Sequence, residues 1–284
     1  MIEQVLKRKN LYKAYRQVVR NKGAAGIDGM TVEELSVYLE ANRDKIITSI
    51  LNCIYVPNAI LAVEIPKSNG KTRLLGIPTV TDRWLQQAVS QVLMTKFELN
   101  FEPVSYGFRP EKNTQQAVSQ SLKYINDGFQ DIVDIDLKGF FDEVDHTKLL
   151  QLIYNKVKCP TTLRLIRKWL RAPIQIKGKL HKRRKGMPQG SPISPLLSNI
   201  LLNELDKELV KRGLRYADDF RIYAKSKAEA RKIGNSIYEF HRDKLHLPIN
   251  KEKSGIPRPV NFELLGHGFA TLYRKGVQGG YTSW

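Results

Sequence analysis

The sequence contains few cysteines and none of the long apolar segments that would carry it into a membrane. Its two cysteines, Cys53 and Cys159, lie far apart, and no Cys or His stands at metal-ligand spacing, so we expect buried thiols in a reducing compartment. The opening "MIEQVLKRKN" lacks the apolar centre of a signal peptide, and no run is long enough to span a bilayer. These absences predict a soluble, cytoplasmic protein with no membrane partner.

Acidic residues are also scarce. Only 28 Asp and Glu stand against 47 Lys and Arg, which gives a formal net charge of +19. So large an excess repels itself unless a polyanion neutralises it, and nucleic acid is the commonest such partner. A membrane surface is the rival partner, but no polybasic segment adjoins a long apolar one. Simple solvation of helix faces is the other alternative, and the size of the imbalance favours RNA or DNA.

Repeats, low-complexity tracts and clear linkers are absent from the 284 residues, which suffice for one large domain or two small lobes. Apolar residues at helical spacing alternate with short β-rich runs, which predicts an α+β fold. In the helix predicted over 30–51, Thr31 and Glu34 match a capping box. The helix predicted from residue 194 should end at Gly213. Further helices are expected at 11–22, 82–98 and 228–245, with strands at 131–137, around the turn 68–70, and within 213–224.

Two adjacent aspartates, Asp218 and Asp219, lie in "GLRYADDFRIYA" between two predicted strands, and Asp136 lies near the end of another. If these strands pair in one sheet, three carboxylates converge at its edge, where mutual repulsion would raise their pKa values. Hard oxygen ligands with open positions suit Mg²⁺, and two such ions can activate a hydroxyl and stabilise a departing pyrophosphate. The alternative is a capped turn and an ordinary Asp-Asp loop. Together in a +19 chain, the residues indicate a nucleotidyl transferase.

At these residues the chain resembles the reverse transcriptases encoded by bacterial group II introns. The resemblance covers nearly the whole chain as an ordered series of motifs. These are "GAAGIDGMTVEEL", "IPKSNGKTRLLGIPTVTDRWLQQAV", "SYGFRPEKNTQQAV", "DIVDIDLKGFFDEVDH", "KGMPQGSPISPLLSNILLNELD", "RYADDF", "LPINKEKS" and "FELLGHGF". It implies a right-hand polymerase fold, with an antiparallel palm sheet packed on helices and a helix-rich fingers lobe.

The resemblance also implies roles for individual residues. Asp136, Asp218 and Asp219 would be catalytic and would hold two Mg²⁺ ions, with the Leu137 carbonyl as a further ligand and Mn²⁺ as a substitute metal. The residues that it assigns to the incoming dNTP are Lys67, Arg73, Phe141, Gln189 and Lys251, with Lys253 as the alternative to Lys251 for protonating pyrophosphate. Each of these residues also has a purely structural alternative. Lys67 and Arg73 could be solvated charges of a hairpin, and Phe141 could be the core member of the pair Phe140-Phe141. Gln189 could belong to an irregular loop, and either lysine could lie on the surface.

Contacts to nucleic acid follow from the same resemblance. The residues assigned to them are Lys22, Tyr106, Phe108, Arg109, Lys182, Arg183, Arg184, Pro188, Gly190, Leu265 and Gly266. The run "KGKLHKRRK" (177–185) holds six basic residues in nine and could follow a phosphate backbone. Aromatic side chains beside Arg109 suit template bases, with simple packing an equal alternative. His146 is expected to be structural.

The expected domains are an N-terminal extension at 1–60, fingers at 61–127, and a palm at 128–284 with part of 155–195 returning to the fingers. The thumb and the C-terminal domains of full-length members do not appear in this sequence. We therefore expect weak processivity, and the apolar surface that a thumb would cover leaves room for a homodimer.

The function expected is RNA-directed DNA polymerase, with an intron RNA template, a DNA primer and dNTPs, and with intron RNA binding that assists splicing. One alternative is an RNA-binding splicing cofactor with an idle polymerase site. Another is an RNA-dependent RNA polymerase, against which Phe141 argues. Retron and diversity-generating relatives share the core motifs, but the N-terminal block and "GFRP" favour the intron family.

Overall fold

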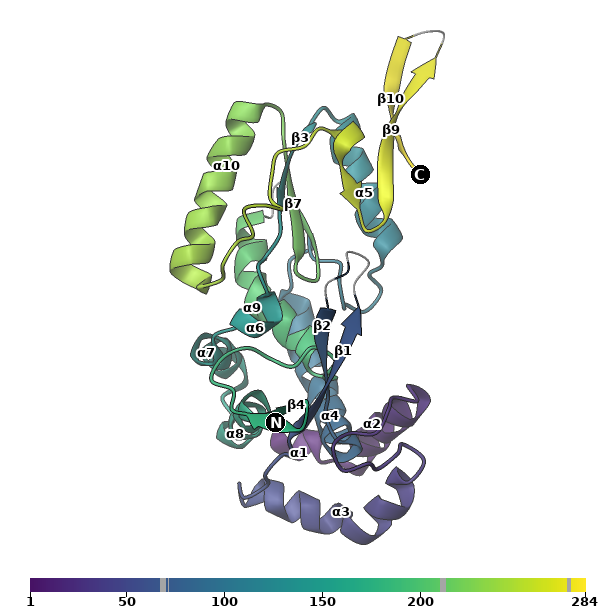
Figure 1. The fold of residues 1–284 in the computed structure, drawn as a ribbon, viewed down its shortest axis with the longest axis vertical. Helices are drawn as coiled ribbons and strands as arrows, with labels where there is room; N and C mark the ends of the chain where they lie inside the picture. Colours follow the sequence, from purple (N-terminus) through teal and green to yellow (C-terminus); the bar gives the residue numbers. More distant parts are fainter. Residues whose placement is uncertain (67–69, 71, 210–212, 275–276) are drawn as a thin grey trace. The chain divides into compact units, whose positions relative to one another are not determined.

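The computed structural model describes residues 1–66, 70, 72–209, 213–274 and 277–284. The chain forms two compact units (Figure 1). Unit 1 comprises residues 1–99 and 141–197, and unit 2 comprises residues 100–140 and 198–284. The predicted boundary at 127/128 lies inside unit 2, because the helix at 114–126 packs against the strands of that unit. The predicted return segment, 155–195, begins earlier, at residue 141.

Unit 1 is mainly helical. Its helices are α1 (Ile2–Val5), α2 (Arg8–Arg20), α3 (Leu35–Leu51), α4 (Val80–Phe97), α7 (His146–Val157) and α8 (Pro160–Arg171), and most of the short α6 (Phe140–Glu143) also belongs to it. The central helix is α4, which is buried on nearly every side and packs against α1 and α2. Trp84 of α4 is buried and its indole N–H donates to the Leu11 carbonyl of α2 (2.9 Å), which fixes the two helices together.

A four-stranded sheet completes unit 1. Its strands are β1 (Ile60–Pro66), β2 (Thr72–Ile77), β4 (Ile174–Ile176) and β5 (Lys179–His181), in the order β2-β1-β4-β5. The antiparallel pairing of β1 with β2 confirms the predicted strand pair, although its turn residues at 67–69 lie outside the described part of the chain. The parallel pairing of β1 with β4 joins segments more than 100 positions apart, which local sequence patterns do not reveal.

A buried carboxylate lies at the centre of unit 1. Asp82, in the first turn of α4, accepts four hydrogen bonds, two on each oxygen. The donors are the Tyr55 hydroxyl (2.8 Å), the Trp169 indole (2.9 Å), the Asn58 backbone N–H (3.0 Å) and the Thr79 hydroxyl (3.0 Å). Burial raises the pKa of Asp82, and the four donors oppose that rise. The carboxylate thus ties α4 to α8 and to the segment that leads into β1.

Unit 2 is built around a three-stranded antiparallel sheet in the order β3-β7-β6. Its elements are α5 (Thr114–Asn126), β3 (Asp131–Ile135), most of α9 (Ser194–Leu209), β6 (Gly213–Tyr216), β7 (Asp219–Ala224), α10 (Lys227–Phe240) and the strands β8 (Glu263–Leu264), β9 (His267–Arg274) and β10 (Val277–Ser283). Helix α5 packs against β6 and β10, and α10 packs against β3 and β7 (Figure 1).

Strand alternation gives the central sheet two different faces. Along β3, Ile132, Asp134 and Asp136 fall on one side, and Val133 and Ile135 fall on the other. Ile132 joins the apolar core under α5, whereas Val133 lies beside α10. After Asp131, which pairs with Arg258, the sequence "DIVDID" is therefore apolar on the α10 side and becomes acidic toward one end of the α5 side.

Several predictions about local structure are confirmed. The strand at 131–137, the helices at 11–22 and 82–98, and the apolar face of α9 all appear, and Phe140 is the core member of the Phe140-Phe141 pair. Within the described residues, no helix has both the length and the apolar composition needed to cross a bilayer. His146 is buried and contacts the Gly186 carbonyl through Nε2 (2.6 Å), as expected for a structural histidine.

Other local predictions were wrong. Helix α3 begins at Leu35, not near Thr31, although Glu34 still accepts the Thr31 backbone N–H (2.8 Å). Gly213 is the first residue of β6, and the predicted end of the preceding helix falls at 210–212, outside the described residues. Cys53 and Cys159 are free but only half-buried, since both lie at the ends of surface helices.

The Asp82 network predicts a specific cost of substitution. We expect Asp82→Asn to lower the free energy of unfolding by about 1–3 kcal/mol, because the amide nitrogen would replace one oxygen and face the two donors that bond to it. Urea unfolding followed by the fluorescence of the buried Trp84 and Trp169 measures this cost. The matched control is Asp44→Asn on α3, where the side chain is 82% exposed. Equal stability of the two variants would contradict the central role of Asp82.

Candidate active site

The sequence "YADD" forms a tight hairpin between β6 and β7. Tyr216 pairs with Asp219, so the loop consists of Ala217 and Asp218 alone. Ala217 adopts a φ of 56°, the left-handed conformation that two-residue hairpin loops require and that costs energy for a residue with a Cβ. The loop therefore needs support from the rest of unit 2.

Arg215 provides that support from within the core. Its side chain is fully buried (0% exposed), and it donates to the Ala217 carbonyl at the hairpin (2.7 Å). The same guanidinium donates twice to the equally buried Asp206 of α9 (2.7 Å each). Asn199 and Ser105 accept its remaining hydrogen bonds (3.0 and 2.7 Å). All the donors thus have partners, as a charge in a dry interior requires.

A glycine brings another segment against the same hairpin. Gly107, in "SYGFRP", accepts a hydrogen bond on its carbonyl from the Asn199 side chain (2.9 Å). A Cβ at Gly107 would lie 2.3 Å from the Ala217 backbone nitrogen, closer than any real contact allows. Only glycine permits this approach between the two backbones.

Asp136 follows directly after β3 and is held by the segment "LPINKEKS". The Asn250 side-chain amide donates to the Asp136 carboxylate (3.1 Å), and the Asn250 backbone N–H donates to the Asp136 carbonyl (2.9 Å). The Asp136 backbone N–H donates to the Ser254 hydroxyl (3.2 Å). Leu137 is buried beside it and forms a β-bridge with Ile249. The aspartate therefore projects from a position that hydrogen bonds fix on both sides.

The strand register brings the three candidate carboxylates together. Ile135 of β3 pairs with Phe220 of β7, so Asp136 and Asp219 occupy the next positions on the neighbouring strands. Burial raises the pKa of Asp218, and the negative charges of Asp219 and Asp136 raise it further. Burial also raises the pKa of Asp219, against the favourable charges of Arg221 and Lys253. The register and the mutual charge effects therefore place Asp136, Asp218 and Asp219 at the same end of the β3-β7-β6 sheet.

An ion pair adjoins this cluster on the same face of the sheet. Arg221 of β7 contacts Asp134 of β3 (3.0 Å), directly across the strand pair. Burial raises the pKa of Asp134, and the guanidinium lowers it. The pair neutralises the acid that lies one strand repeat before Asp136, which leaves the cluster at the strand ends as the site that still attracts cations.

The structure separates the two lysines that sequence reasoning could not. The Lys251 ammonium lies over the Tyr238 ring of α10, 5.5 Å from its centroid. The positive charge of Lys253 instead lowers the pKa of Asp219. The geometry therefore favours Lys253, and not Lys251, as the lysine beside the carboxylates.

The donor set fits Mg²⁺ bound together with a substrate. The three carboxylates are half-buried, repel one another, and offer only hard oxygen atoms, which is what Mg²⁺ prefers. Among the described residues, no three His, Cys, Asp or Glu side chains are close enough to hold a metal ion alone. A partial protein ligand set is typical of Mg²⁺ sites, which phosphates and water complete.

The residues assigned to the nucleotide lie in unit 1, apart from the lysines just described. The loop 186–190 is fixed by two backbone hydrogen bonds, from Met187 to the Phe141 carbonyl and from Gly76 to the Gln189 carbonyl (2.7 Å each). Pro188 is buried against Gly76, and Gly190 has a φ of 109°. Phe141, Gln189 and β2 are therefore parts of one rigid arrangement.

Arg73 belongs to that arrangement as an exposed residue of β2, opposite Ile65. Lys67, its predicted partner at the triphosphate, lies outside the described residues. The structure therefore describes only Arg73 of the two residues predicted to clamp the triphosphate.

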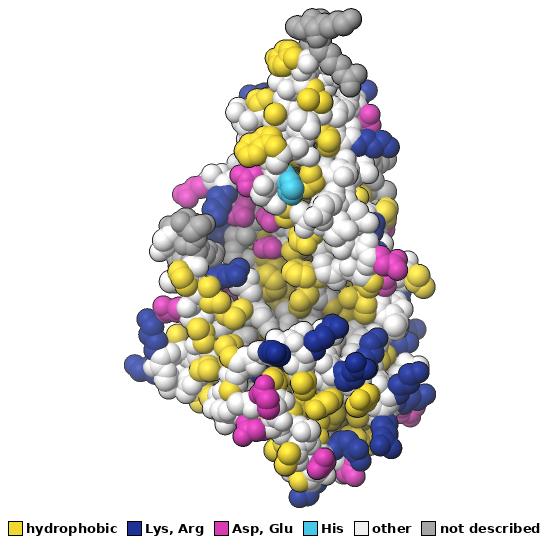
Figure 2. All heavy atoms as spheres, turned by 90° about the vertical axis from the view of Figure 1, so that its right-hand side faces the viewer, with side chains coloured by type: hydrophobic (Ala, Val, Ile, Leu, Met, Phe, Trp, Pro, Cys, Tyr) yellow, Lys and Arg dark blue, Asp and Glu magenta, His cyan; other side chains and the backbone are white. Residues whose placement is uncertain are grey.

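The residues predicted to contact nucleic acid fall into two groups. Phe108 is 48% exposed, and Lys22, Lys182, Arg184 and Gly190 are exposed as well. Leu265 and Gly266 form the two-residue loop between β8 and β9 with φ values of 54° and 80°. On unit 1, Figure 2 shows Lys and Arg side chains around apolar surface. These positions are accessible to a polyanion.

The other group points inward. Tyr106 belongs to the core of unit 2, with Lys112 over its ring. Arg109 donates to the carbonyls of Glu102 and Ser105 (2.7 and 3.0 Å). Arg183 is half-buried near Asp142, which favours its charge. Packing, the alternative considered for the "SYGFRP" aromatics, is the role that the structure gives Tyr106.

The residues that support the carboxylates are not evident from the sequence. Arg215, Asp206, Asn250 and Ser254 were passed over because each resembles an ordinary surface residue. A signal was available for the first two. Arg215 lies inside an apolar strand, and Asp206 follows Leu202 by four positions on the buried face of α9.

Comparison with known proteins places this geometry in a family. A family model described as reverse transcriptase (RNA-dependent DNA polymerase) matches residues 65–269. The chain belongs to the reverse transcriptase family. It is 38% identical over 206 residues to the group II intron-encoded protein LtrA of Lactococcus lactis, an alignment that covers 72% of this chain and 34% of LtrA. This likeness confirms the resemblance to group II intron reverse transcriptases.

Further relatives extend the comparison. Protein YkfC of Escherichia coli is 32% identical over 306 aligned positions, which cover 90% of this chain and 79% of YkfC. A chain of a Cas6-RT-Cas1–Cas2 complex has a similar fold, with a TM-score of 0.54, 24% identity, and coverage of 85% of this chain and 41% of that chain. Telomerase from Candida tropicalis gives a TM-score of 0.56 with 16% identity, over 84% of this chain and 47% of that chain. The predicted polymerase fold is thereby confirmed, and the chain spans about a third of the length of LtrA.

Arg215→Lys tests the support of the hairpin. A lysine keeps the charge but cannot reach Asp206, Asn199, Ser105 and the Ala217 carbonyl together. We expect the free energy of unfolding to fall by about 3 kcal/mol, the scale of breaking a buried ion pair. Chemical denaturation measures it. Arg242→Lys, in an exposed pair with Asp243, is the control and should leave stability unchanged. A fall no larger than that of the control would show that the buried network is dispensable.

Gly107→Ala tests the contact between backbones. The added Cβ must push the Ala217 loop away, so amide hydrogen exchange across 214–221 should become faster while the rest of unit 2 keeps its protection. Gly255→Ala is the control, since a Cβ there meets no atom within 4 Å and its φ is not positive. Unchanged exchange at the hairpin in Gly107→Ala would contradict the close approach.

Proposed function

We propose that this chain is the catalytic core of an RNA-directed DNA polymerase of a group II intron. It adds dNTPs to the 3′ end of a DNA primer on an RNA template. The observation that carries the proposal is the meeting of Asp136 with Asp218 and Asp219 at one end of the β3-β7-β6 sheet. Membership in the reverse transcriptase family supports the assignment of this cluster to nucleotidyl transfer.

In this proposal Asp136, Asp218 and Asp219 hold two Mg²⁺ ions, with the Leu137 carbonyl as a further ligand and Mn²⁺ as a substitute. When bound, such ions lower the pKa of the primer hydroxyl and neutralise the charge that develops on the phosphates. Asn250 and Ser254 hold Asp136 in place, and Arg215 holds the hairpin that carries the other two. Lys253 gives a proton to pyrophosphate in this proposal, which is supported by the effect of its positive charge on Asp219.

The choice of nucleotide is assigned to Phe141. Its backbone is fixed through Met187, so its half-buried ring has little freedom to withdraw. A ring held beneath the sugar excludes a 2′-hydroxyl by contact, and dNTPs are then preferred over NTPs. This preference separates the proposed reaction from that of an RNA-dependent RNA polymerase.

The second candidate function is binding of intron RNA to assist splicing. The positive charge of +19 and the likeness to LtrA support it. The two functions are compatible on one chain, and they depend on different residues. Only polymerisation requires the carboxylate cluster.

The decisive experiment is extension of a DNA primer on an RNA template, with Mg²⁺ and either dNTPs or NTPs. We expect the wild-type chain to use dNTPs. Asp218→Ala and Asp136→Asn should each lower the rate of the first addition at least about 100-fold, the scale of losing one preorganised electrostatic group. Asp243→Asn, an exposed acid in unit 2, should not change it.

Two results would count against the proposal. If wild type and Asp218→Ala were equally inactive while intron RNA bound tightly, the splicing-cofactor function would replace polymerisation. If NTPs were used as well as dNTPs, the role of Phe141 would be wrong.

A further inference from the structure

One segment of unit 1 contains no acidic residue at all. Between Asp145 and Glu204 the sequence has 13 Lys and Arg and not one Asp or Glu, although the whole chain has 28 acids. The basic run 177–185 accounts for only part of this excess. The rest belongs to α7 and α8, the two helices that precede it.

Helices α7 and α8 pack against each other and bury their apolar faces. The buried residues of α8 are Thr162, Leu165, Ile166, Trp169 and Leu170. Arg164, Arg167 and Arg171 fall on its exposed side at spacings of three and four, so they form one stripe along the helix. Neighbouring arginines of the stripe are about one helical turn apart, which is about 5.4 Å along the helix axis.

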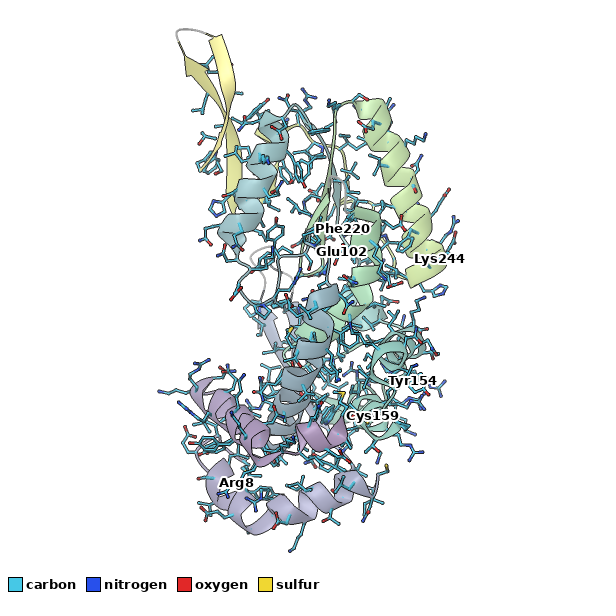
Figure 3. The ribbon with its side chains drawn as sticks, turned by 180° about the vertical axis from the view of Figure 1, so that it is seen from behind. Arg8, Glu102, Tyr154, Cys159, Phe220 and Lys244 are labelled. Carbon is cyan, nitrogen blue, oxygen red and sulfur yellow. The ribbon has the colours of Figure 1, made fainter. Side chains whose placement is uncertain are left out.

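Helix α7 adds to the same basic character. Its exposed residues include Tyr154 (45% exposed; Figure 3) and Lys156, and Lys158 follows at the turn into α8. Lys156 lies over the Phe97 ring, 5.5 Å from its centroid. We define the basic face as the exposed stripe Arg164, Arg167 and Arg171 of α8 together with Lys158 at the turn between α7 and α8.

Part of this charge has no carboxylate partner in the part of the chain that the structure describes. Among the described residues, no carboxylate pairs with Arg167 or Arg171, and α7 and α8 themselves supply none. Lys168 shows the contrast, because its ammonium donates to the carbonyls of Cys53 and Tyr55 (2.8 and 2.6 Å) and so has a structural role. Arg164 forms a hydrogen bond with the Cys53 side chain, so Arg167 and Arg171 are the guanidinium groups of the stripe that are available to an external anion.

The chemistry of the face selects the kind of partner. A protein interface would need an apolar centre, and a membrane-bound helix would need an apolar face to insert. The stripe on α8 offers neither, since its exposed positions are basic and its apolar residues are buried. Guanidinium groups in a row match the regularly spaced phosphates of a nucleic acid, to which each can donate two hydrogen bonds.

We propose that the basic face binds the phosphate backbone of structured RNA. The choice of RNA as the polyanion rests on the proposed function, whereas the binding of phosphates rests on the residues alone. The face is separate in sequence from the residues 182–184 and adds a second phosphate-binding surface to unit 1. Its contacts are to backbone, so the affinity that it adds should not depend on RNA sequence.

The test compares Arg167→Gln/Arg171→Gln with Arg231→Gln/Lys232→Gln. Both pairs remove two exposed charges from a helix, but α10 also carries Glu229 and Glu239. The probe is a labelled RNA hairpin, titrated at several KCl concentrations without primer or dNTP. We expect the α8 variant to bind more weakly and the slope of log K against log salt to fall by about two, one for each lost phosphate contact. The α10 variant should keep the wild-type slope.

Equal slopes for the two variants would overturn the proposal, as would equal loss of binding to polyglutamate, which would indicate an acidic protein partner instead. Thermal melting of both variants shows whether the surface substitutions leave the fold intact, and Arg171→Lys should restore most of the binding. Primer extension is measured separately at saturating template. If the wild-type chain did not extend the primer, the proposed polymerase function would be wrong, but the result of the RNA-binding titration would still stand.

Discussion

The buried contact between Arg215 and Asp206 is the constraint on which the geometry of unit 2 depends. A guanidinium with no solvent exposure must satisfy its donors inside the protein, and it does so by joining α9, the segment around Ser105 and the loop of the YADD hairpin. A strained two-residue loop would otherwise be free to move. Since Asp218 lies in this loop and Asp219 follows it as the first residue of β7, their position is determined by a charge in the core.

The opposite side of the cluster has a different kind of support. Asp136 is held through Asn250 and Ser254, which lie more than 110 positions later in the chain. The register of β3 with β7 then fixes its distance from Asp219. Close backbone approach at Gly107 completes the arrangement, because it leaves no room for the hairpin to shift. Carboxylates that repel one another can stay together only in such a framework.

Sequence alone was enough for the parts of the fold that depend on local pattern. The apolar face of α9, the alternation in "DIVDID" and the strands on both sides of "ADD" led directly to α9, β3, β6 and β7. The convergence of Asp136 with Asp218 and Asp219 followed from strand ends and a family resemblance. Most residues of the candidate site were therefore predicted from the ordered sequence motifs.

What sequence could not give depends on contacts between distant segments. The partners of Asp136 and Arg215 are set by tertiary packing, and so is the choice of Lys253 over Lys251, since Tyr238 of α10 holds the latter. The predicted boundary at 127/128 falls inside unit 2, where α5 packs against β6 and β10, and these contacts between distant segments are not visible in the sequence. Tyr106 was assigned to nucleic acid because an aromatic beside an arginine looks the same in a core and on a surface.

The central claim is that Asp136 and the YADD hairpin form one cation site. Crystals grown with Mn²⁺, a primer–template and a non-reactive nucleotide would test it directly through the anomalous signal of the metal. The account predicts Mn²⁺ bound jointly by Asp136 and Asp218, with Asp219 beside them and the nucleotide phosphates completing the coordination. Metal bound elsewhere, or Asp136 turned away from the hairpin in the presence of metal and nucleotide, would contradict it.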